Sequence, residues 1–201
     1  MEELRSQHHN AVITERPLGA RGVAVWFTGL SGAGKTTLCG AVAERLRQRG
    51  MDVTVLDGDE LRHGAHADLG YGRADREENV RRIGAIVEEL VTRHKIVLVA
   101  AISPYRAMRD AIRGRTPAFV EVYVNAPLAT CMERDRKGLY RRALAGEIEY
   151  FTGVSDPYEI PLAPEVECST ADESVDASAE KVMAALSLFF GIPQRLKPDL
   201  L

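Results

Sequence analysis

Residues 29–36 read GLSGAGKT and follow directly on the apolar run VAVWFT at 23–28. They satisfy the pattern G-x-x-x-x-G-K-[ST] in full, and they stand between a predicted strand and a predicted helix, where that pattern is functional. Glycine is poor in strands and costly in helices, so local stability does not explain three glycines here. Glycines do allow backbone N–H groups to curl around phosphate oxygens, which a helix N-terminus also attracts. The stretch therefore predicts a phosphate-binding loop for a nucleoside triphosphate.

Two side chains of this loop have predicted roles. Lys35 is expected to reach the outer phosphates, and the Thr36 hydroxyl is expected to ligate Mg²⁺. A glycine-rich turn with an incidental lysine is disfavoured because both pattern and context are complete. No guanine-reading motif such as NKxD is present, so a kinase of a small molecule or nucleotide is favoured over a GTPase. The predicted ATP-binding residues of the loop are Gly29, Leu30, Ser31, Gly32, Ala33, Gly34, Lys35, Thr36 and Thr37.

Strand-length apolar runs alternate with helical patterns along the rest of the chain. Runs without polar alternation are buried on both faces, and their alternation with helices predicts a parallel sheet covered by helices. In the longest helical pattern, Asp75 followed by Glu78 predicts a capping-box start. Strands are predicted at 23–28, 52–56, 96–102 and 119–124, and helices at 36–49, 74–94, 105–113, 128–134 and 175–190.

The chain of 201 residues suits one domain of ordinary size. An N-terminal extension is expected over 1–21, the domain over 22–191 and a C-terminal tail over 192–201. The start, MEELRSQHHN, is acidic and polar and so is not expected to be a signal peptide. The longest apolar run, at 96–102, is far too short to cross a bilayer, so no membrane association is expected.

The charges of the chain indicate which partners it could bind, and its cysteines indicate the redox compartment. The net charge of −3 argues against a general nucleic-acid binder. Of the 26 lysines and arginines, 16 fall between Arg62 and Arg142, which suits an anionic substrate but would also suit a solvated face. Three widely spaced cysteines fit free thiols in a reducing cytoplasm better than disulfides or a zinc site. They are Cys39, Cys131 and Cys168.

The second predicted strand ends in carboxylates. In VTVLDGDELR at 53–62, Asp57 and Asp59 follow the apolar residues. The carboxyl ends of parallel strands form a ligand crevice on the same edge as the phosphate loop. Two carboxylates there could hold Mg²⁺ through water, orient an acceptor hydroxyl or accept its proton. A polar turn in which Asp57 caps the next helix is the plainer alternative. Arg62 is expected to face the same crevice.

From these motifs onward the sequence resembles the adenylylsulfate kinase family, over most of the span from Gly22 to Thr170. The resemblance implies phosphoryl transfer from ATP to the ribose 3′-hydroxyl of adenosine 5′-phosphosulfate, giving 3′-phosphoadenylyl sulfate. This combination is much more specific than the phosphate loop alone. The matching stretches are WFTGLSGAGKTT (26–37), LDGDELR (56–62), DLGYGRADREENVRR (68–82), ISPYRAMRD (102–110) and FVEVYVNAPLATCMERDRKGLYRRALAGEIEYFTGVSDPYEIP (119–161).

The resemblance also implies a fold and a set of partners. The expected fold is α/β, a three-layer P-loop kinase fold with a mostly parallel sheet of about five strands, helices on both faces and a mobile lid. Mg²⁺ is the expected cofactor, held by Thr36 and Asp57, with ATP as co-substrate. A cytoplasmic homodimer is expected, and an ATP sulfurylase is a candidate functional partner. Neither nucleic acid nor a membrane is an expected partner.

Acceptor-site roles follow from the same resemblance. Arg76 and Asn79 are three residues apart on a predicted helix, so both can point at one ligand. With Arg62 they are expected to hold the phosphosulfate and nucleotide of the acceptor, a task that suits the guanidinium fork. The neighbouring arginines are interpreted as solvated surface: Arg73, Arg81 and Arg82.

Ser103 follows the third predicted strand and, with Ile102, resembles the family residues that line the acceptor site. In some members that serine has been proposed to carry phosphate, but direct in-line transfer needs no such intermediate, so contact is expected. A helix N-cap is the alternative for Ser103, and both could hold together. Arg106 and Arg109 are interpreted as structural.

The stretch RDRKGLYRRALAGEIEYFTG at 134–153 mixes cations, glycines and aromatics without a clear apolar stripe, which suits a mobile lid. By resemblance, Lys137 and Leu139 contact the acceptor, and Arg134 lies near the ATP base. Phe151 is expected to stack on the acceptor's adenine.

Tyr71 stands where the family usually has a phenylalanine, and it is expected to cover the other face of the adenine opposite Phe151. Ordinary core burial is the alternative for both aromatics.

The catalytic residues expected on this hypothesis are Lys35, Asp57, Asp59 and Ser103, with Asp59 orienting the hydroxyl or acting as base. Two alternatives stay open. The first is another P-loop small-molecule kinase. On that hypothesis the chain would contain DGDELR, DREEN and RDRKGLY together only by coincidence. A catalytically silent nucleotide-binding partner of a sulfurylase would be expected to lack the loop lysine or the acceptor arginines, which are all present.

Overall fold

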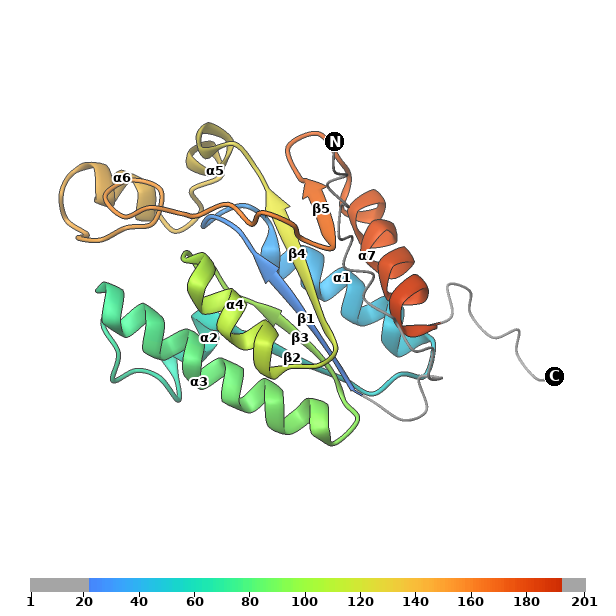
Figure 1. Ribbon diagram of the computed structural model, residues 1–201. Coiled ribbons are helices and arrows are strands. Elements are labelled where there is room, and N and C mark those ends of the chain that lie inside the picture. The colour runs from blue at the N-terminus through green and yellow to red at the C-terminus, as the bar shows by residue number, and fades with distance from the viewer. Residues whose placement is uncertain (1–21, 193–201) are drawn as a thin grey trace, which may run out of the picture.

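The computed structural model describes residues 22–192, in which five strands and seven helices follow one another (Figure 1). The predicted N-terminal extension and the predicted tail beyond Ile192 lie outside the described residues. The elements are β1 (Val23–Thr28), α1 (Lys35–Gln48), β2 (Val53–Asp57), α2 (Gly58–His63), α3 (Arg73–Thr92), β3 (Ile96–Ala100), α4 (Arg106–Arg115), β4 (Phe119–Asn125), α5 (Leu128–Glu133), α6 (Leu139–Leu144), β5 (Val166–Ser169) and α7 (Val175–Phe190).

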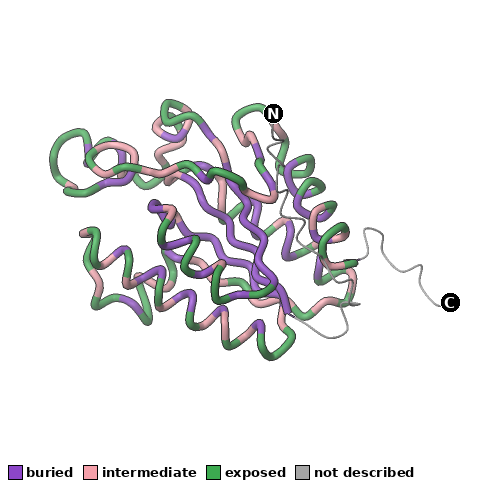
Figure 2. Tube along the Cα trace, viewed as in Figure 1, coloured by how far each residue is buried: buried purple, intermediate pink, exposed green. Residues whose placement is uncertain are grey.

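The strands form one parallel sheet in the order β2-β3-β1-β4-β5. β1 and β3 are buried throughout and β4 in all but its last residue, whereas the edge strands β2 and β5 are partly exposed (Figure 2). Uninterrupted apolar runs need cover on both faces, which is why these three strands occupy the middle of the sheet. The predicted parallel α/β fold with helices on both faces is confirmed.

β1 joins the two helical layers. Successive side chains of a strand point to opposite faces of the sheet. Val25 and Phe27 belong to the apolar cluster that includes α1 and α7, whereas Trp26 belongs to the cluster that includes α3 and α4. Figure 1 shows α1 and α7 on one side of the sheet and α3 and α4 on the other. Both halves of the core therefore depend on this strand.

The predicted strands and helices are confirmed, with ends shifted by no more than a residue or two. The predicted capping box is wrong. α3 begins before Asp75, and its N-cap is Gly72, which has no side chain to accept a hydrogen bond. Glu78 therefore lies inside the helix, where its carboxylate binds Arg81 and Arg82.

Three short elements, α2, α6 and β5, have no counterpart among the predicted ranges. β5 has four residues, too few to show a period, and it is defined by pairing with β4 from Val122↔Val166 onward. α2 starts where the Asp57 side chain accepts hydrogen bonds from the backbone N–H of Asp59 (2.8 Å) and Glu60 (3.4 Å). The helix-cap alternative for Asp57 is thus confirmed.

The structure also tests the predictions of free cysteines and of a chain without membrane-spanning helices. All three cysteines are buried and free, as their spacing predicted. Within residues 22–192, every helix is too short or too polar to cross a membrane.

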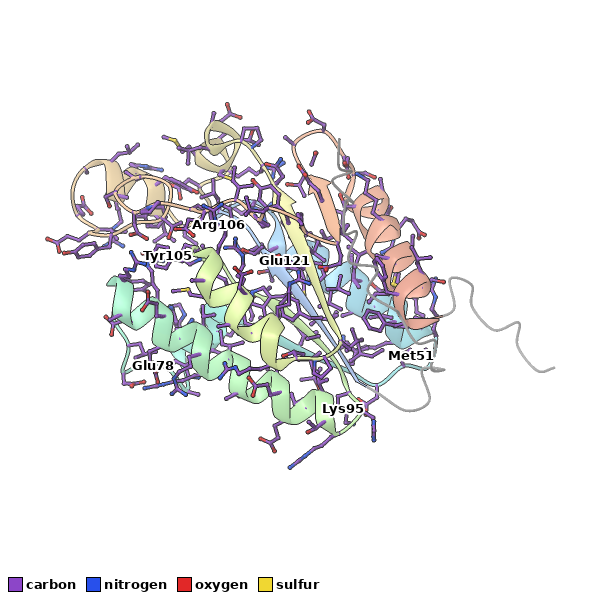
Figure 3. The ribbon with its side chains drawn as sticks, in the orientation of Figure 1. Met51, Glu78, Lys95, Tyr105, Arg106 and Glu121 are labelled. Atoms are coloured by element: carbon purple, nitrogen blue, oxygen red, sulfur yellow. The ribbon has the colours of Figure 1, made fainter. Side chains whose placement is uncertain are left out.

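A buried ion pair joins α4 to β4. The Arg109 side chain is 2% exposed, and its Nε donates to Glu121 at 2.7 Å. Its two terminal nitrogens donate to the carbonyl oxygens of Ser103 (2.6 Å) and Glu159 (2.7 Å). Figure 3 marks Glu121 on β4 and Arg106 at the start of α4. The structural interpretation of Arg109 is confirmed.

Replacing Arg109 by methionine would leave the buried Glu121 carboxylate without its closest cation. We expect this variant to lose about 3 kcal/mol or more in free energy of unfolding, measured by urea denaturation. Arg106→Met is the control, because Arg106 is 42% exposed and lies 3.5 Å from Glu159. Its expected loss is about 0–1 kcal/mol. Equal losses in the two variants would contradict the structural role of Arg109.

Candidate active site

One large pocket, of about 1110 Å³, opens at the carboxyl edge of the sheet. It is lined by the phosphate loop after β1, the turns after β2 and β3, the start of α3 and the segment 134–153. All predicted site residues except three line this pocket. The three exceptions are Gly29, Leu30 and Ala33. These residues lie together because the strands are parallel, so the loops that follow them all start at one edge of the sheet.

The phosphate loop has the backbone shape that its glycines predict. At Gly29 a Cβ would lie 2.4 Å from the Val124 carbonyl oxygen, so no larger residue fits against β4. Gly34 has φ +97°, a left-handed conformation that L side chains rarely adopt, and α1 begins at the next residue. Ala33 is fully buried beneath the loop. Gly29 and Ala33 therefore shape the loop without lining the pocket.

Lys35 lies against its own loop. Its Nζ donates to the Leu30 carbonyl oxygen at 2.8 Å. Burial lowers the pKa of Lys35 to about 8, against the attraction of the Asp59 and Asp57 carboxylates, which raises it. The nearby carboxylates only partly offset the cost of burying the charged lysine. A phosphate bound in the loop would supply further negative charge beside it.

Thr36 and Asp57 form the candidate magnesium site. The Thr36 hydroxyl donates to Asp57 Oδ2 at 2.7 Å, while Oδ1 of the same carboxylate caps α2. Hydroxyl and carboxylate oxygens are the hard ligands that Mg²⁺ takes, usually with waters and substrate phosphates. Among the described residues, no group of three or more histidine, cysteine or acidic side chains could hold a metal. The donor set therefore fits an ion bound together with a nucleotide.

Asp59 forms an ion pair with Lys137, across from the phosphate loop. The two side chains, each 62% exposed, approach to 2.8 Å. Burial raises the pKa of Asp59, but the hydrogen bond from Lys137 and the charges of Lys137 and Lys35 outweigh it, so the pKa falls below its usual range. Asp59 is therefore ionised and a weak base in this arrangement.

Arg76 is buried in the wall of the pocket. Its Nε donates to the Tyr71 carbonyl oxygen at 2.8 Å, and Nη2 donates to the Tyr150 carbonyl oxygen. Arg62 lies nearby and donates to the Gly70 carbonyl oxygen at 2.7 Å. Burial, together with the charge of Arg76, lowers the pKa of Arg62. These two cations are fixed by the backbone around them and raise the positive potential of this half of the pocket.

Asn79 also lines the pocket, and its hydrogen-bond partner is a residue that no motif or spacing in the sequence indicates. Asn79 and His66 are both buried, and Asn79 Oδ1 lies 2.9 Å from His66 Nδ1. The three arginines interpreted as solvated surface do not line the pocket. Arg73, Arg81 and Arg82 make ion pairs with acidic residues of the same helix.

Ser103 is buried in a left-handed conformation, with φ +45°. Its hydroxyl accepts a hydrogen bond from Trp26 Nε1 at 3.0 Å. The helix-cap alternative for Ser103 is wrong, because α4 has its N-cap at Tyr105. A non-glycine residue in this conformation carries strain that the surrounding contacts must hold. The neighbouring Ile102 is fixed through its carbonyl oxygen, which accepts from Thr28 Oγ1 at 2.7 Å.

The segment 134–153 is better packed than its composition suggests. Tyr140 and Phe151 are buried, with ring centroids 5.0 Å apart in an edge-on arrangement. Tyr140 also donates to the Ser31 carbonyl oxygen of the phosphate loop at 2.9 Å. The expectation that this segment lacks a core stripe is therefore wrong, because its apolar residues pack on a loop far away in sequence. Its mobility stays a prediction.

The remaining predicted contacts are placed as follows. Arg134 lines the pocket and donates to the Thr170 carbonyl oxygen at 2.7 Å. Phe151 is buried in the core and also lines the pocket, so core burial and contact with a ligand are compatible for this residue. Tyr71 is 55% exposed, and the Arg62 guanidinium lies 5.1 Å from its ring centroid. The adenine sandwich between Tyr71 and Phe151 stays a prediction.

The family model and the curated relatives that this chain matches point to the same family. Residues 21–169 match the family model described as adenylylsulphate kinase. The adenylyl-sulfate kinase of Synechococcus sp. (strain JA-3-3Ab) is 57% identical over 170 residues, which are 84% of this chain and 96% of the relative. That of Gloeothece citriformis (strain PCC 7424) is 55% identical over 167 residues, covering 83% of this chain and 94% of the relative.

Solved structures agree with this relationship. The structure of the Mycobacterium tuberculosis APS kinase in complex with AMPPNP and APS is 43% identical, with a TM-score of 0.80 over 86% of this chain and 99% of the other. A gluconokinase from Sinorhizobium meliloti 1021 has a TM-score of 0.55 at 18% identity over 88% of this chain and 96% of the other, a likeness of fold alone.

The lowered pKa of Lys35, about 8, predicts a proton uptake on binding of a triphosphate. The ligand favours the charged lysine and raises its pKa, so the complex binds more protons than the free protein above about pH 7, and affinity falls as the pH rises toward about 9. At about pH 8 to 9 the triphosphate itself is ionised, so the lysine is the group whose protonation changes on binding. Calorimetry of ATP binding in buffers of different ionisation enthalpy measures the uptake. Lys35→Arg stays charged and should lose it; the same uptake in that variant would exclude Lys35 as its source.

Proposed function

The chain belongs to the adenylyl-sulfate kinase family, and on that premise we propose which of its residues carry out the family's reaction. The protein is an ATP-dependent kinase of adenosine 5′-phosphosulfate. The γ-phosphoryl group of ATP passes to the ribose 3′-hydroxyl, whose proton is released, and the products are ADP and 3′-phosphoadenylyl sulfate. The observation that carries the proposal is a single pocket that joins a complete phosphate loop to a buried cationic acceptor side.

We propose that Lys35, Thr36 and Asp57 manage the charge of the nucleotide. The loop N–H groups and the start of α1 face the phosphates, and Lys35 neutralises their outer oxygens. Mg²⁺ would be held by Thr36 and Asp57, and when bound it supplies charge neutralisation between the outer phosphates. The 2.7 Å contact between these two side chains supports this assignment. Arg134 lies at the nucleotide end of the pocket, beside Thr170.

The acceptor is proposed to lie across the pocket from the nucleotide. Arg62, Arg76 and Asn79 would bind its phosphosulfate and ribose oxygens, and Phe151 would stack on its adenine. Burial of Arg76 and its two bonds to backbone carbonyls support this placement, because a fixed guanidinium loses little entropy on binding an oxyanion. Tyr71, Ile102, Lys137 and Leu139 complete the proposed acceptor wall.

Asp59 is proposed to orient the 3′-hydroxyl rather than to remove its proton before transfer. Its pKa is lowered by Lys137, so it is a poor base in the free protein. Phosphoryl transfer has a loose transition state in which positioning and charge neutralisation dominate, so a strong base is not required. Ser103 is proposed to contact the acceptor without forming a phosphoenzyme, since Trp26 fixes its buried hydroxyl.

We propose that the enzyme works in the cytoplasm as a homodimer and that an ATP sulfurylase supplies its substrate. Free buried thiols support a reducing compartment. The solved structure of a hexameric APS kinase from Thiobacillus denitrificans is 33% identical to this chain, which supports assembly within the family. ATP sulfurylation is the reaction that makes the acceptor, which supports the functional partnership.

Acceptor-dependent release of ADP tests the function. With MgATP, we expect turnover with adenosine 5′-phosphosulfate and none with AMP, shikimate, gluconate or no acceptor, with the product identified by chromatography. Lys35→Ala should lower kcat by about 10²-fold or more, because it removes a cation from the transferring phosphoryl group. Turnover with another acceptor would indicate a different small-molecule kinase. ATP binding with no turnover would indicate a non-catalytic partner of a sulfurylase.

Arg76→Ala tests the placement of the acceptor. Loss of a charged hydrogen-bond donor should raise the KM for adenosine 5′-phosphosulfate by about 10- to 100-fold. The dissociation constant for ATP, measured by calorimetry, should change by less than about threefold, because Arg76 lies on the other side of the pocket. Equal losses for the two ligands would show that the acceptor site is misplaced. Arg73→Ala is the control, because Arg73 lies on the same helix and its side chain is 69% exposed.

A further inference from the structure

His66 lies in the connection between α2 and α3, and it is 4% exposed. The backbone on both sides of its side chain is fixed. Its N–H donates to the Leu61 carbonyl oxygen at 2.8 Å, and its own carbonyl oxygen accepts from the Leu69 N–H at 3.1 Å. The imidazole is therefore presented to α3 from a defined position rather than from a free loop.

The structure orients the Asn79 carboxamide with Oδ1 2.9 Å from His66 Nδ1. In this orientation the amide oxygen accepts, so the matching His66 tautomer carries its proton on Nδ1 and donates it. The carboxamide is thereby held with its oxygen toward His66. Across residues 22–192, this is the one hydrogen bond of the Asn79 side chain. Because Asn79 lines the pocket, the amide nitrogen Nδ2 is the end left for a ligand.

We propose that His66 is a positioning residue, which fixes the Asn79 carboxamide so that the acceptor always meets a hydrogen-bond donor. This inference rests on the proposed acceptor role of Asn79. The phosphosulfate oxygens of the acceptor only accept hydrogen bonds, whereas an amide turned by half a rotation would present its own oxygen to them. Without His66, a fraction of the protein holds that unproductive orientation, and acceptor affinity falls accordingly.

A purely structural role for His66 makes a different prediction, and the molecule offers a matched control. The same connection is held to α3 at a second point, where Arg82 donates to both carboxylate oxygens of Asp68 at 2.7 and 2.8 Å. Arg82 lies one turn beyond Asn79 on α3, and within residues 22–192 its side chain hydrogen-bonds to Glu78 and Asp68, not to the Asn79 carboxamide. Asp68→Asn therefore loosens the loop without releasing the amide.

The test compares steady-state kinetics of four variants. His66→Leu removes the donor and should raise the KM for adenosine 5′-phosphosulfate about tenfold, with the KM for ATP changed by less than about twofold. His66→Asn places an amide nitrogen where Nδ1 lay and should restore the KM. His66→Gln places its nitrogen at the Nε2 position and should not. Asp68→Asn should stay within about twofold of wild type.

A double-mutant cycle separates positioning from packing. If His66 acts through Asn79, then His66→Leu in an Asn79→Ala background should cause no further loss in kcat/KM for the acceptor. Additive losses, failure of His66→Asn to rescue, or an equal effect of Asp68→Asn would overturn the inference. Should His66→Leu not fold, as judged by thermal melting, the contrast between His66→Asn and His66→Gln carries the same test. If wild type shows no turnover with this acceptor, the proposed function fails instead.

Discussion

The constraint on which the rest of the structure depends is the burial of β1 on both faces. A strand of six buried residues must lie in the middle of a covered sheet, between β3 and β4. Its carboxyl end, and with it the phosphate loop, therefore opens at the centre of the edge where the neighbouring strands also end. Asp57 at the end of β2 and Ser103 after β3 therefore line the same pocket as the phosphate loop.

Lys35 and Arg76 bring positive charge to the pocket in different ways. Burial lowers the pKa of Lys35 to about 8, so a bound phosphate would favour its charged form most strongly above neutral pH. Arg76 is already bonded to two backbone carbonyl oxygens and so is organised in advance. Asp59 and Lys137, which also line the pocket, form an exposed ion pair.

Local signals predicted most of the fold and the phosphate loop of the site. The phosphate loop, the strands β1 to β4 and α7 are encoded by continuous stretches, so the sequence shows them directly. The roles of other residues depend on partners far away in the chain. Tyr140 meets Ser31 across 109 positions, and Tyr158 meets Thr28 across 130. No periodicity reveals such pairs, and the same applies to His66 with Asn79, which only the α2–α3 connection brings together. The capping box at Asp75 failed because the helix begins before it.

Arg109 has a consequence for how this protein tolerates change. One side chain in the core satisfies Glu121 of β4, the strained Ser103 and the carbonyl oxygen of Glu159. Substitutions in α4 or β4 that shift this guanidinium are therefore expected to move Ser103, which lines the pocket, as well as the core. Repacking α4 would thus alter the shape of the pocket together with the stability of the interior.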